Sequence, residues 1–545
     1  MKYITIKITF AFIAGLLVFT TGCNEDEFLT RYSKAEPNPE NFFVDDATAR
    51  MAVNACYHPW LYGGASMLNR DMTILLDAMT DDSYWRPNRG SSIALERWDI
   101  SPTHDNVSSW WNNIYQSINA ANFAIENIPN SSDANFTSEA QAPFIAEAKF
   151  LRGYNYLFLT SLYGGVPLFT STASDFEKFN TGRSSKDEIL EQVIADFQDA
   201  KEDLPDGISQ QGTPTRAAAA AFLAKTYLVL EDWPNAEAAA REAIQIAEAD
   251  GYRMLDDYMS IWSEEGNAEL LFYWSFVNNS EDYGQNMTVQ RLCRDLPSGL
   301  RIPIGGDGWG YSLPQRDLYD AFEVNDPRRE YTLYSPGQNY EIYPGAEPFD
   351  YTHEIIPSQG DTVRWDVTYE AGDMVEYDYR WSPTGLNVRK MTKSVKDIAN
   401  VRWDGLDIPV MRMAEVYLIL AEALAEQDDA EALTWLNKVR SRPSVNMPDK
   451  TTADGDLVDL VRHERRVELA MEGLRLFDLL RWGTLEEVFG DGTKVKRNFY
   501  SDYLPESSSL KYDAPVGNLA LDPIFPIPQD EIDQNSEINT NNPGW

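Results

Sequence analysis

Apolar residues recur at helical spacing in two separate blocks of the chain. In the first block, one face of a helix is formed by Ala217, Ala220, Ala221, Ala224 and Leu228. Thr213-Pro214 precedes this helix, a capping residue followed by the residue best tolerated in a first turn. We expect Trp233-Pro234 to end the helix and residues 235–249 to form a second, Ala-rich helix.

The same two-helix unit recurs in the second block. Its first helix carries an apolar face made of Val416, Ile419, Leu420, Ala423 and Leu424, and its second helix spans residues 430–440. Paired helices with small residues at their contacts resemble tetratricopeptide units, whose period is about 34 residues. Further helices are predicted at residues 46–61, 109–127, 143–163, 186–204 and 457–489.

Residues 252–407 differ in composition and pattern from the two helical blocks. They are rich in Gly, Pro, Trp and Tyr and contain short β-prone runs such as Leu270–Trp274. Because so long a segment without structure would be unusual in a compact fold, we expect ordered loops and short hairpins packed against the helices. The sequence therefore predicts a mainly α fold with tetratricopeptide-like helix pairs and an irregular, loop-rich region, where we expect the ligand.

The first residues have the pattern of an export signal. Lys2 and Lys7 give a positive start, and residues 8–19 form an apolar stretch that is too short to span a membrane. The stretch ends in Thr20-Thr21-Gly22-Cys23, which resembles a bacterial lipobox with Thr20 where Leu is usual. We expect residues 1–22 to be removed and Cys23 to be lipidated, since several acyl chains anchor a protein stably. The alternative is ordinary secretion that leaves Cys23 as a free thiol.

Charge limits the ligand. The chain of 545 residues has 46 Lys and Arg against 86 Asp and Glu, a formal net charge of −40. So acidic a surface repels nucleic acid and anionic lipid headgroups, so we expect neither as a ligand. Neutral ligands fit this charge better than anionic ones.

Cysteine and histidine usage predicts no metal or cofactor site. With Cys23 lipidated, Cys56 and Cys293 remain, and two isolated buried thiols are favoured over a disulfide between them. The four histidines show no metal-binding spacing, and the run that starts at His463 departs from the HExxH pattern at its last position.

Several longer strings resemble the signatures of the SusD/RagB family. They are NFF at residues 41–43, EAKFLRGY at 147–154, LYGGVPL at 162–168, PTR at 214–216, ERRVELAMEG at 464–473, RLFDLLRWG at 475–483, PIPQDEI at 526–532 and NPGW at 542–545. The strings occur in the family's order and run from near the start of the mature chain to its last residue. The acidic run Glu25-Asp26-Glu27 is also similar to the export signal of surface lipoproteins in this group of bacteria.

The resemblance implies a function as well as a fold. Such proteins are lipid-anchored at the cell surface beside a TonB-dependent, SusC-like outer-membrane transporter. They capture an oligosaccharide, or in some members a peptide, act as the transporter's lid and have no catalytic activity. On this basis we divide the chain into a signal peptide (1–22), an N-terminal helical region (23–250), an irregular aromatic-rich insert (251–409) and a C-terminal helical region with its tail (410–545).

A charged cluster lies in the C-terminal strings. It consists of Glu464, Arg465, Arg466, Glu468, Glu472, Arg475, Asp478 and Arg481. Glu468 and Glu472 are spaced to share one helix face. A glycosidase would need two carboxylates across a cleft, one with a raised pKa, whereas neighbouring arginines lower carboxylate pKa values. We therefore expect a structural ion-pair network, not an active site.

Aromatic residues in polar loops are the candidate ligand contacts, because Trp and Tyr offer flat apolar faces together with hydrogen-bonding groups. Trp85 lies in a loop with Asp82 and Arg86 as polar partners; Trp309 and Tyr311 follow a Gly-rich run; Trp365, Tyr379 and Trp381 lie in the irregular insert. A packing role remains the equal alternative for each. Trp110, Trp111, Trp435 and Trp482 lie in predicted helices and are expected in the core.

Three functions stay open at this point. The first is capture of a glycan at the cell surface. The second is capture of oligopeptides on the same scaffold, which a site rich in charges would favour. The third is a surface-anchored hydrolase, which detectable cleavage of a glycan would establish. Helix-pair repeats also bind proteins, and that role is compatible with ligand capture.

Overall fold

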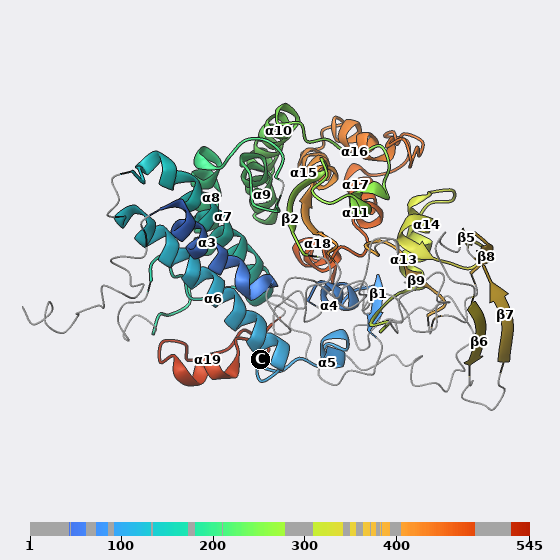
Figure 1. Cartoon of the computed structure of the whole chain (residues 1–545), viewed down its shortest axis with the longest axis horizontal. Helices are drawn as coiled ribbons and strands as arrows, with labels where there is room; N and C mark the ends of the chain where they lie inside the picture. Colours follow the sequence, from blue (N-terminus) through green and yellow to red (C-terminus); the bar gives the residue numbers. More distant parts are fainter. Residues whose placement is uncertain are drawn as a thin grey trace, which may run out of the picture.

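A computed structural model of the chain describes residues 43, 45–61, 72–85, 92–131, 135–172, 180–209, 211–277, 309–341, 349–355, 363–370, 372–377, 382, 384–392, 405–485 and 525–545 (Figure 1). Its helices are α3 (Asp46–Leu61), α4 (Met72–Ala78), α5 (Ser92–Glu96), α6 (Asp105–Asn127), η1 (Ile128–Asn130), α7 (Ser138–Tyr163), α8 (Lys186–Asp203), α9 (Arg216–Val229), α10 (Trp233–Ala249), α11 (Ser260–Ser263), α13 (Arg316–Ala321), α14 (Arg328–Thr332), α15 (Met413–Ala425), α16 (Ala432–Arg440), α17 (Leu457–Glu468), α18 (Arg475–Arg481) and α19 (Gln529–Gln534).

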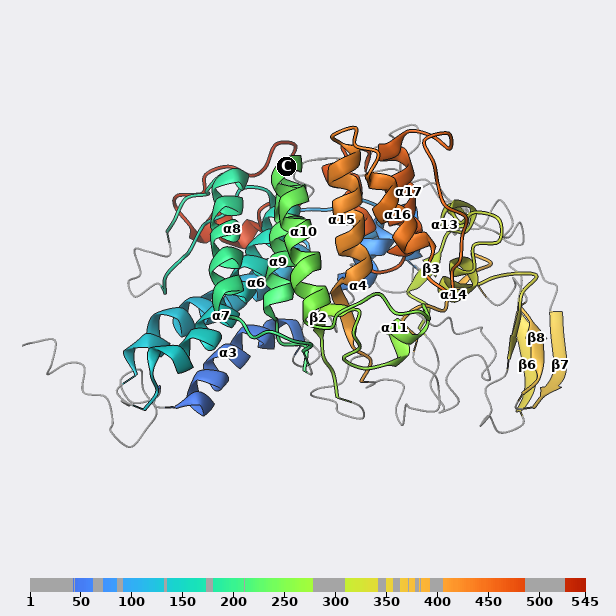
Figure 2. The same cartoon turned by 90° about the horizontal axis from the view of Figure 1, so that it is seen from above.

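The long helices pack against one another in chain order. α3 contacts α6, α6 contacts α7, and the series continues through α8, α9 and α10. α10 then contacts α15, which packs on α16 and α17, so the two helical blocks form one continuous array (Figure 2). The predicted mainly α fold is confirmed, whereas the tetratricopeptide-like nature of the helix pairs stays a prediction.

Side-chain caps fix where several helices begin. At α8 the Ser185 hydroxyl accepts from the Glu188 amide while the Glu188 carboxylate accepts from the Ser185 amide, a reciprocal capping box. At α9 the cap is Thr215, whose hydroxyl accepts from the Ala218 amide. The expected cap at Thr213 is therefore wrong by two residues, because Pro214 precedes the helix and does not lie in its first turn.

Other predicted boundaries are wrong as well. α6 begins at Asp105 and not at residue 109, and α7 begins at Ser138 and not at residue 143. Pro234 lies in the first turn of α10, where the missing N–H of proline costs little, so it begins the second helix and does not end the first. The single helix predicted at 457–489 is two helices, because α17 ends at Glu468 and the chain turns through positive φ angles at Met471 (64°) and Gly473 (77°) before α18. Residues 486–489 lie outside the described part.

Ion pairs join the N-terminal and C-terminal blocks of helices. Lys225 on α9 contacts Glu415 on α15 at 2.9 Å. Arg241 on α10 donates to both carboxylate oxygens of Glu431, at 2.8 and 2.7 Å. The first pair includes a buried carboxylate, and the second is partly exposed and contributes less.

Strands are short and occur in pairs. They are β1 (Ser83–Trp85), β2 (Leu270–Trp274), β3 (Ser312–Pro314), β4 (Leu333–Tyr334), β5 (Asn339–Glu341), β6 (Phe349–Ile355), β7 (Val363–Tyr369), β8 (Met374–Glu376), β9 (Asn387–Val388) and β10 (Ile408–Arg412). Each sheet has two antiparallel strands: β1 with β3, β2 with β10, β4 with β9, β5 with β8 and β6 with β7. The β-prone run at Leu270–Trp274 is thus a strand, as predicted, and it pairs with the last strand of the irregular region.

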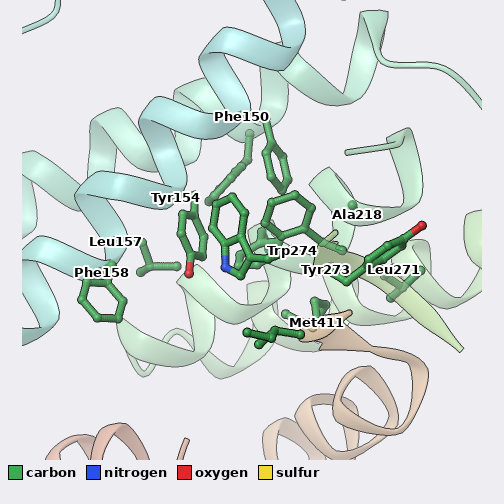
Figure 3. Close-up of a cluster of buried hydrophobic side chains, with 14 of the residues drawn as sticks. Phe150, Tyr154, Leu157, Phe158, Ala218, Leu271, Tyr273, Trp274 and Met411 are labelled. Carbon is green, nitrogen blue, oxygen red and sulfur yellow. The ribbon is translucent and has the colours of Figure 1, made fainter. Parts of the chain in front are cut away.

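β2 lies at the centre of the hydrophobic core. Trp274 on this strand stacks on Trp60 of α3, with ring centroids 5.1 Å apart and planes 14° apart, and meets Tyr154 of α7 edge-on at 5.6 Å. Figure 3 shows Phe150 and Tyr154 beside Trp274, with Met411 of β10 on the other side. Burial of each such side chain stabilises the fold by about 1.5–3 kcal/mol. The core therefore ties the helical array to both ends of the irregular region.

The helical tryptophans follow expectation only in part. Trp110 and Trp111 are buried in α6. Trp435 and Trp482 are partly exposed, and each is covered by a cation: Lys438 lies 5.3 Å from the Trp435 ring and Arg462 lies 5.0 Å from the Trp482 ring.

Cys56 is a buried free thiol of α3, and its burial raises the pKa of the thiol far above its usual value. Its possible partner Cys293 lies outside the described residues, as does Cys23. Within the described part of the chain, no helix combines the length and the apolar character needed to cross a membrane.

Candidate functional site

The β1–β3 ribbon brings together two segments that the sequence analysis singled out. Trp85 at the end of β1 is paired in register with Ser312 of β3. Tyr311 directly precedes β3 and stacks on Trp85, with ring centroids 5.0 Å apart and planes 24° apart. Trp309 extends the row, because its ring lies 5.6 Å from that of Tyr311. The three rings form a continuous aromatic row, which we call the aromatic row below.

The three rings differ in exposure. Trp85 is 0% exposed and Tyr311 is 7% exposed, whereas Trp309 is partly exposed. The Trp85 ring therefore has no free face for a sugar, which corrects the expectation of a direct contact there, and its place is that of a packing residue beneath Tyr311. Trp309 is the ring of the row that a ligand can reach.

Polar side chains hold the ribbon from within. The Ser83 and Ser312 hydroxyls lie 2.8 Å apart across the two strands. Gln315, which directly precedes α13, donates from its side-chain amide to the Ser83 carbonyl at 2.8 Å, and its backbone N–H donates to the Asp82 carbonyl at 2.9 Å. These buried hydrogen bonds fix the register on which the aromatic row depends.

Asp82 does not face a ligand. Its carboxylate is 0% exposed and accepts from Arg466 Nε at 2.9 Å. The neighbouring Asp81 is held by Arg475, whose Nε and Nη2 donate to its two oxygens at 3.0 and 3.1 Å, and by Arg466 at 2.9 Å. The predicted role of Asp82 as a polar ligand contact is therefore replaced by an anchor: two arginines from the C-terminal strings fix the segment that leads into Trp85.

The electrostatics of the two aspartates differ. Burial pushes the pKa of Asp81 up, but Arg466 and Arg475 outweigh it and hold the pKa below its usual value. Asp82 is buried more deeply, and that burial raises its pKa despite the same arginines. The pair thus depends on both guanidinium groups to keep two adjacent buried carboxylates together.

The remaining predicted contacts are not gathered with the aromatic row. Trp365 lies on β7, where it pairs in register with His353 of β6, and both views place this hairpin at the end of the long axis, away from β1 and β3 (Figures 1 and 2). Arg86, Tyr379 and Trp381 lie outside the described residues, so their ligand role stays a prediction.

The charged strings form a buried network, as expected. Its centre is Arg412 at the end of β10, which is 1% exposed. Arg412 donates to Glu468 at 2.7 Å, to the two oxygens of Glu472 at 2.8 and 3.0 Å, and to Glu269 at 3.0 Å. Glu468 and Glu472 thus meet the same cation, but they do not share a helix face as predicted, because α17 ends at Glu468.

The network has the pKa pattern of a structural element. Burial alone would raise the pKa of Glu468, but Arg412, Arg442 and Arg328 outweigh it and hold the pKa far below its usual value. The pKa of Glu472 is lowered in the same way by Arg412 and Lys390. A general acid would need the opposite shift at neutral pH.

The buried residues that pair with the charged side chains of the C-terminal strings were not predicted. Arg412, Arg328, Arg442 and Glu269 are 0–1% exposed and lie outside the C-terminal strings. One signal was available: Glu269 directly precedes the apolar run of β2, and Arg412 lies within an apolar run at β10. A charge inside a buried strand requires a buried partner.

One cluster has the composition of a metal site but not its chemistry. Oxygens of Glu323 and Glu464 and a ring nitrogen of His463 lie within 4.8 Å of one another. Both carboxylates already pair with Arg440, at 2.7 and 2.8 Å, and His463 Nε2 lies 2.8 Å from the Ala321 carbonyl. The donor atoms are therefore engaged by the protein itself.

Two family models match the chain. The model of the SusD family matches residues 249–545, and a second model, described as starch-binding and associating with the outer membrane, matches residues 39–228. The chain belongs to the SusD/RagB family.

Similar proteins extend over nearly the whole chain. SusD-like protein P2 of Formosa agariphila is 27% identical over 560 residues, which cover 99% of each chain. A SusD-like carbohydrate binding protein from Bacteroides fragilis has the same fold, with a TM-score of 0.71, 24% identity and coverage of 91% of this chain and 100% of the other. A laminarin-binding SusD-like protein gives a TM-score of 0.70 at 23% identity, covering 92% and 100%. The fold is therefore SusD-like.

Proposed function

We propose that this chain is a cell-surface lipoprotein that captures a nutrient oligosaccharide and delivers it to a partner TonB-dependent outer-membrane transporter, for which it acts as a lid. Family membership supports the proposal, since one matching model is described as starch-binding and a structural neighbour binds laminarin. Lipidation of Cys23 supplies the membrane anchor, and the formal net charge of −40 favours a neutral glycan.

The aromatic row carries the ligand part of this proposal. A sugar ring presents C–H groups that pack on an aromatic face, and a face held rigidly costs little entropy on binding. Trp309 is partly exposed, and Tyr311 and Trp85 support it from behind. The ribbon beneath is fixed by Arg466 and Arg475. A rigid, partly exposed indole packed on buried rings is the arrangement that a glycan-binding surface needs.

No hydrolysis is part of the proposal. A pair of glycosidase carboxylates would include one with a raised pKa beside an accessible cleft. In the C-terminal strings, the carboxylates are buried and paired with arginines. Capture followed by import is the function that this arrangement supports.

A binding measurement tests the proposal. Residues 24–545 are titrated with neutral oligosaccharides prepared from starch, laminarin, mannan and xylan, with Trp309→Ala as the test variant. Trp435→Ala is the matched control, because Trp435 is also a partly exposed indole but lies on α16. We expect at least about fivefold weaker binding for Trp309→Ala, since an aromatic contact is worth about 1 kcal/mol or more, and no change for the control. Equal binding by both variants contradicts the site, and cleavage of a glycan contradicts the function.

A further inference from the structure

A second cavity lies on another part of the molecule, between α6 and the C-terminal helix α19. Its volume is about 520 Å³, within the usual range of about 300–1,000 Å³ for ligand pockets. One wall is a stripe of α6 that includes Trp111, Tyr115 and Asn119, and the opposite wall includes Glu531 and Gln534 of α19. Figure 1 shows α19 below α6, apart from the β1–β3 ribbon.

The wall of the cavity contains a fixed aromatic surface. Trp111 is buried, and its ring lies 4.9 Å from that of Tyr115. Tyr115 in turn meets Phe169 edge-on at 5.9 Å, and both of these rings are partly exposed. The Tyr115 hydroxyl donates to the Pro167 carbonyl at 2.8 Å, which fixes the orientation of the ring. The ring faces therefore need no reordering to receive an apolar surface.

Carboxamides surround this aromatic surface. Asn112, Asn119 and Gln534 are exposed at the edge of the cavity. Each amide group offers both a donor and an acceptor, which matches the paired donor and acceptor character of sugar hydroxyls. Two further amides are engaged in the wall itself: Asn122 donates to the Phe169 carbonyl at 3.0 Å, and Asn535 donates to the Thr181 carbonyl at 3.0 Å.

Charge at the cavity selects against anions. Among the described residues that line it, Glu531 is the charged one, and the others are aromatic, aliphatic, hydroxyl or amide residues. A sulfate or carboxylate on a ligand would meet Glu531 directly, at a cost that grows as water is excluded. The nearby cation, Arg183, acts on Tyr115 from outside the lining and already donates to the Gly165 carbonyl and to Asn542 Oδ1. Partly exposed rings, neutral amides and one carboxylate together suit a neutral, hydroxyl-rich ligand.

We propose that this α6–α19 cavity is a second carbohydrate-binding site, which takes a short neutral oligosaccharide independently of the aromatic row. The inference rests on the proposed glycan-capture function and adds a second contact to it. Two separate sites on one chain bind a long glycan more tightly than either site alone, because the second contact forms at high effective concentration.

The test uses residues 24–545 and isothermal titration with short neutral oligosaccharides from the same starch, laminarin, mannan and xylan panel. The variant Asn112→Ala, Asn119→Ala, Gln534→Ala removes three exposed amides, so it leaves the fold intact. Trp309→Ala removes the other site. We expect the wild type to bind at two sites, and the amide variant to lose one of them with at least tenfold weaker binding there, because each lost hydrogen bond is worth about 0.5–1.5 kcal/mol. Trp309→Ala should retain that site.

The outcomes separate this inference from the proposed function. If the wild type binds a glycan and the amide variant binds it with the same affinity and stoichiometry, the second site is wrong and the capture function stands. If no glycan in the panel binds the wild type, the capture function fails and the second site fails with it. If short peptides bind in the amide-dependent manner instead of glycans, the assignment to carbohydrate is overturned. As a further check, a sulfated oligosaccharide of the same length should bind the amide-dependent site at least tenfold more weakly than the neutral one.

Discussion

Replacement of Arg466 by methionine tests whether the C-terminal strings hold the aromatic row in place. Arg466 contacts both buried aspartates that lead into β1, Asp81 at 2.9 Å and Asp82 at 2.8 Å. Methionine keeps much of the side-chain length but removes the positive charge. Arg475 then remains as the partner of Asp81, and the Asp82 carboxyl stays at 0% exposure without its ion-pair partner.

The expected cost follows from that burial. Breaking a buried ion pair by removing one partner costs about 3–5 kcal/mol, because the other charge stays desolvated. A free energy of this size corresponds to a factor of about 10² to 5 × 10³ in an equilibrium constant. We expect it to act first on the β1–β3 ribbon, because these aspartates directly precede β1 and pair with arginines of the C-terminal strings.

Hydrogen–deuterium exchange measures this effect at the ribbon. Amides of residues 83–85, 312, 313 and 315 should exchange about 10² to 5 × 10³ times faster in Arg466→Met than in wild type. Arg316→Met is the control, because its pair with Asp320 is exposed and worth at most about 1 kcal/mol. Adding Asp82→Asn to Arg466→Met should restore most of the protection, since it removes the unpaired charge. Exchange within threefold of wild type in Arg466→Met, or no recovery in the double variant, would refute the anchoring role.

Three further predictions concern stability. Gly473→Ala should lower the free energy of unfolding by about 2 kcal/mol or more in urea titrations, because φ is +77° and a Cβ would lie 2.7 Å from Thr73 Cγ2. Gly337→Ala is the control for the strained φ (+81°), since no atom lies within 4 Å of its Cβ. An equal loss of stability in both variants would contradict the predicted clash with Thr73. Burial raises the pKa of Asp407 to about 6, so its carboxyl contributes stability that is complete below pH 3.8 and is lost as pH rises through 6. Asp407→Asn should therefore raise the free energy of unfolding at pH 7 by up to about 3 kcal/mol, seen as a higher thermal midpoint, with little effect at pH 4. The same gain at both pH values would contradict this. The pKa of Glu468 is depressed, so the stability it contributes is present above pH 4.5 and falls on acidification. Glu468→Gln should therefore have a lower thermal midpoint than the wild type at pH 7. An unchanged midpoint would contradict the stabilising role of the ion-pair network.

Helices were predictable where the apolar pattern was long and regular. The helix expected at residues 46–61 matches α3 at both ends, and the helices expected at 186–204 and 235–249 agree with α8 and α10 within one or two residues. The errors occurred where one residue serves two purposes. Pro234 can end a helix or begin one, and Met471 adopts a positive φ that its residue type does not suggest. At Pro234 a local cap decides the case, because the Asp232 side chain accepts from the Asn235 amide and begins α10 there.

The site was predictable in its parts but not in its arrangement. Position in a polar, Gly-rich context pointed to Trp85, Trp309 and Tyr311, and the structure stacks them in one row. Which ring is exposed depends on the β1–β3 pairing, across more than two hundred residues of sequence, and no local pattern contains that information. Asp82 was misassigned for the same reason, because its partner Arg466 lies 384 positions away.

Pairing of β2 with β10 places the two ends of the irregular region side by side, at Trp274 and Ile408. The segment between these strands therefore leaves and rejoins the helical array at one place, and two further contacts hold it there: β3 pairs with β1, and Arg328 pairs with Glu464 and Glu468. The cost of closing a loop changes only slowly with its length, by about 0.6 kcal/mol for each doubling. Residues between these strands can lengthen, shorten or exchange with little effect on the distance between the helical blocks. A chimera that carries a relative's segment between the same two strands should fold on this array if the segment keeps a strand that pairs with β1 and an arginine at position 328, so one scaffold can be fitted to many ligands by replacing the residues between these contacts.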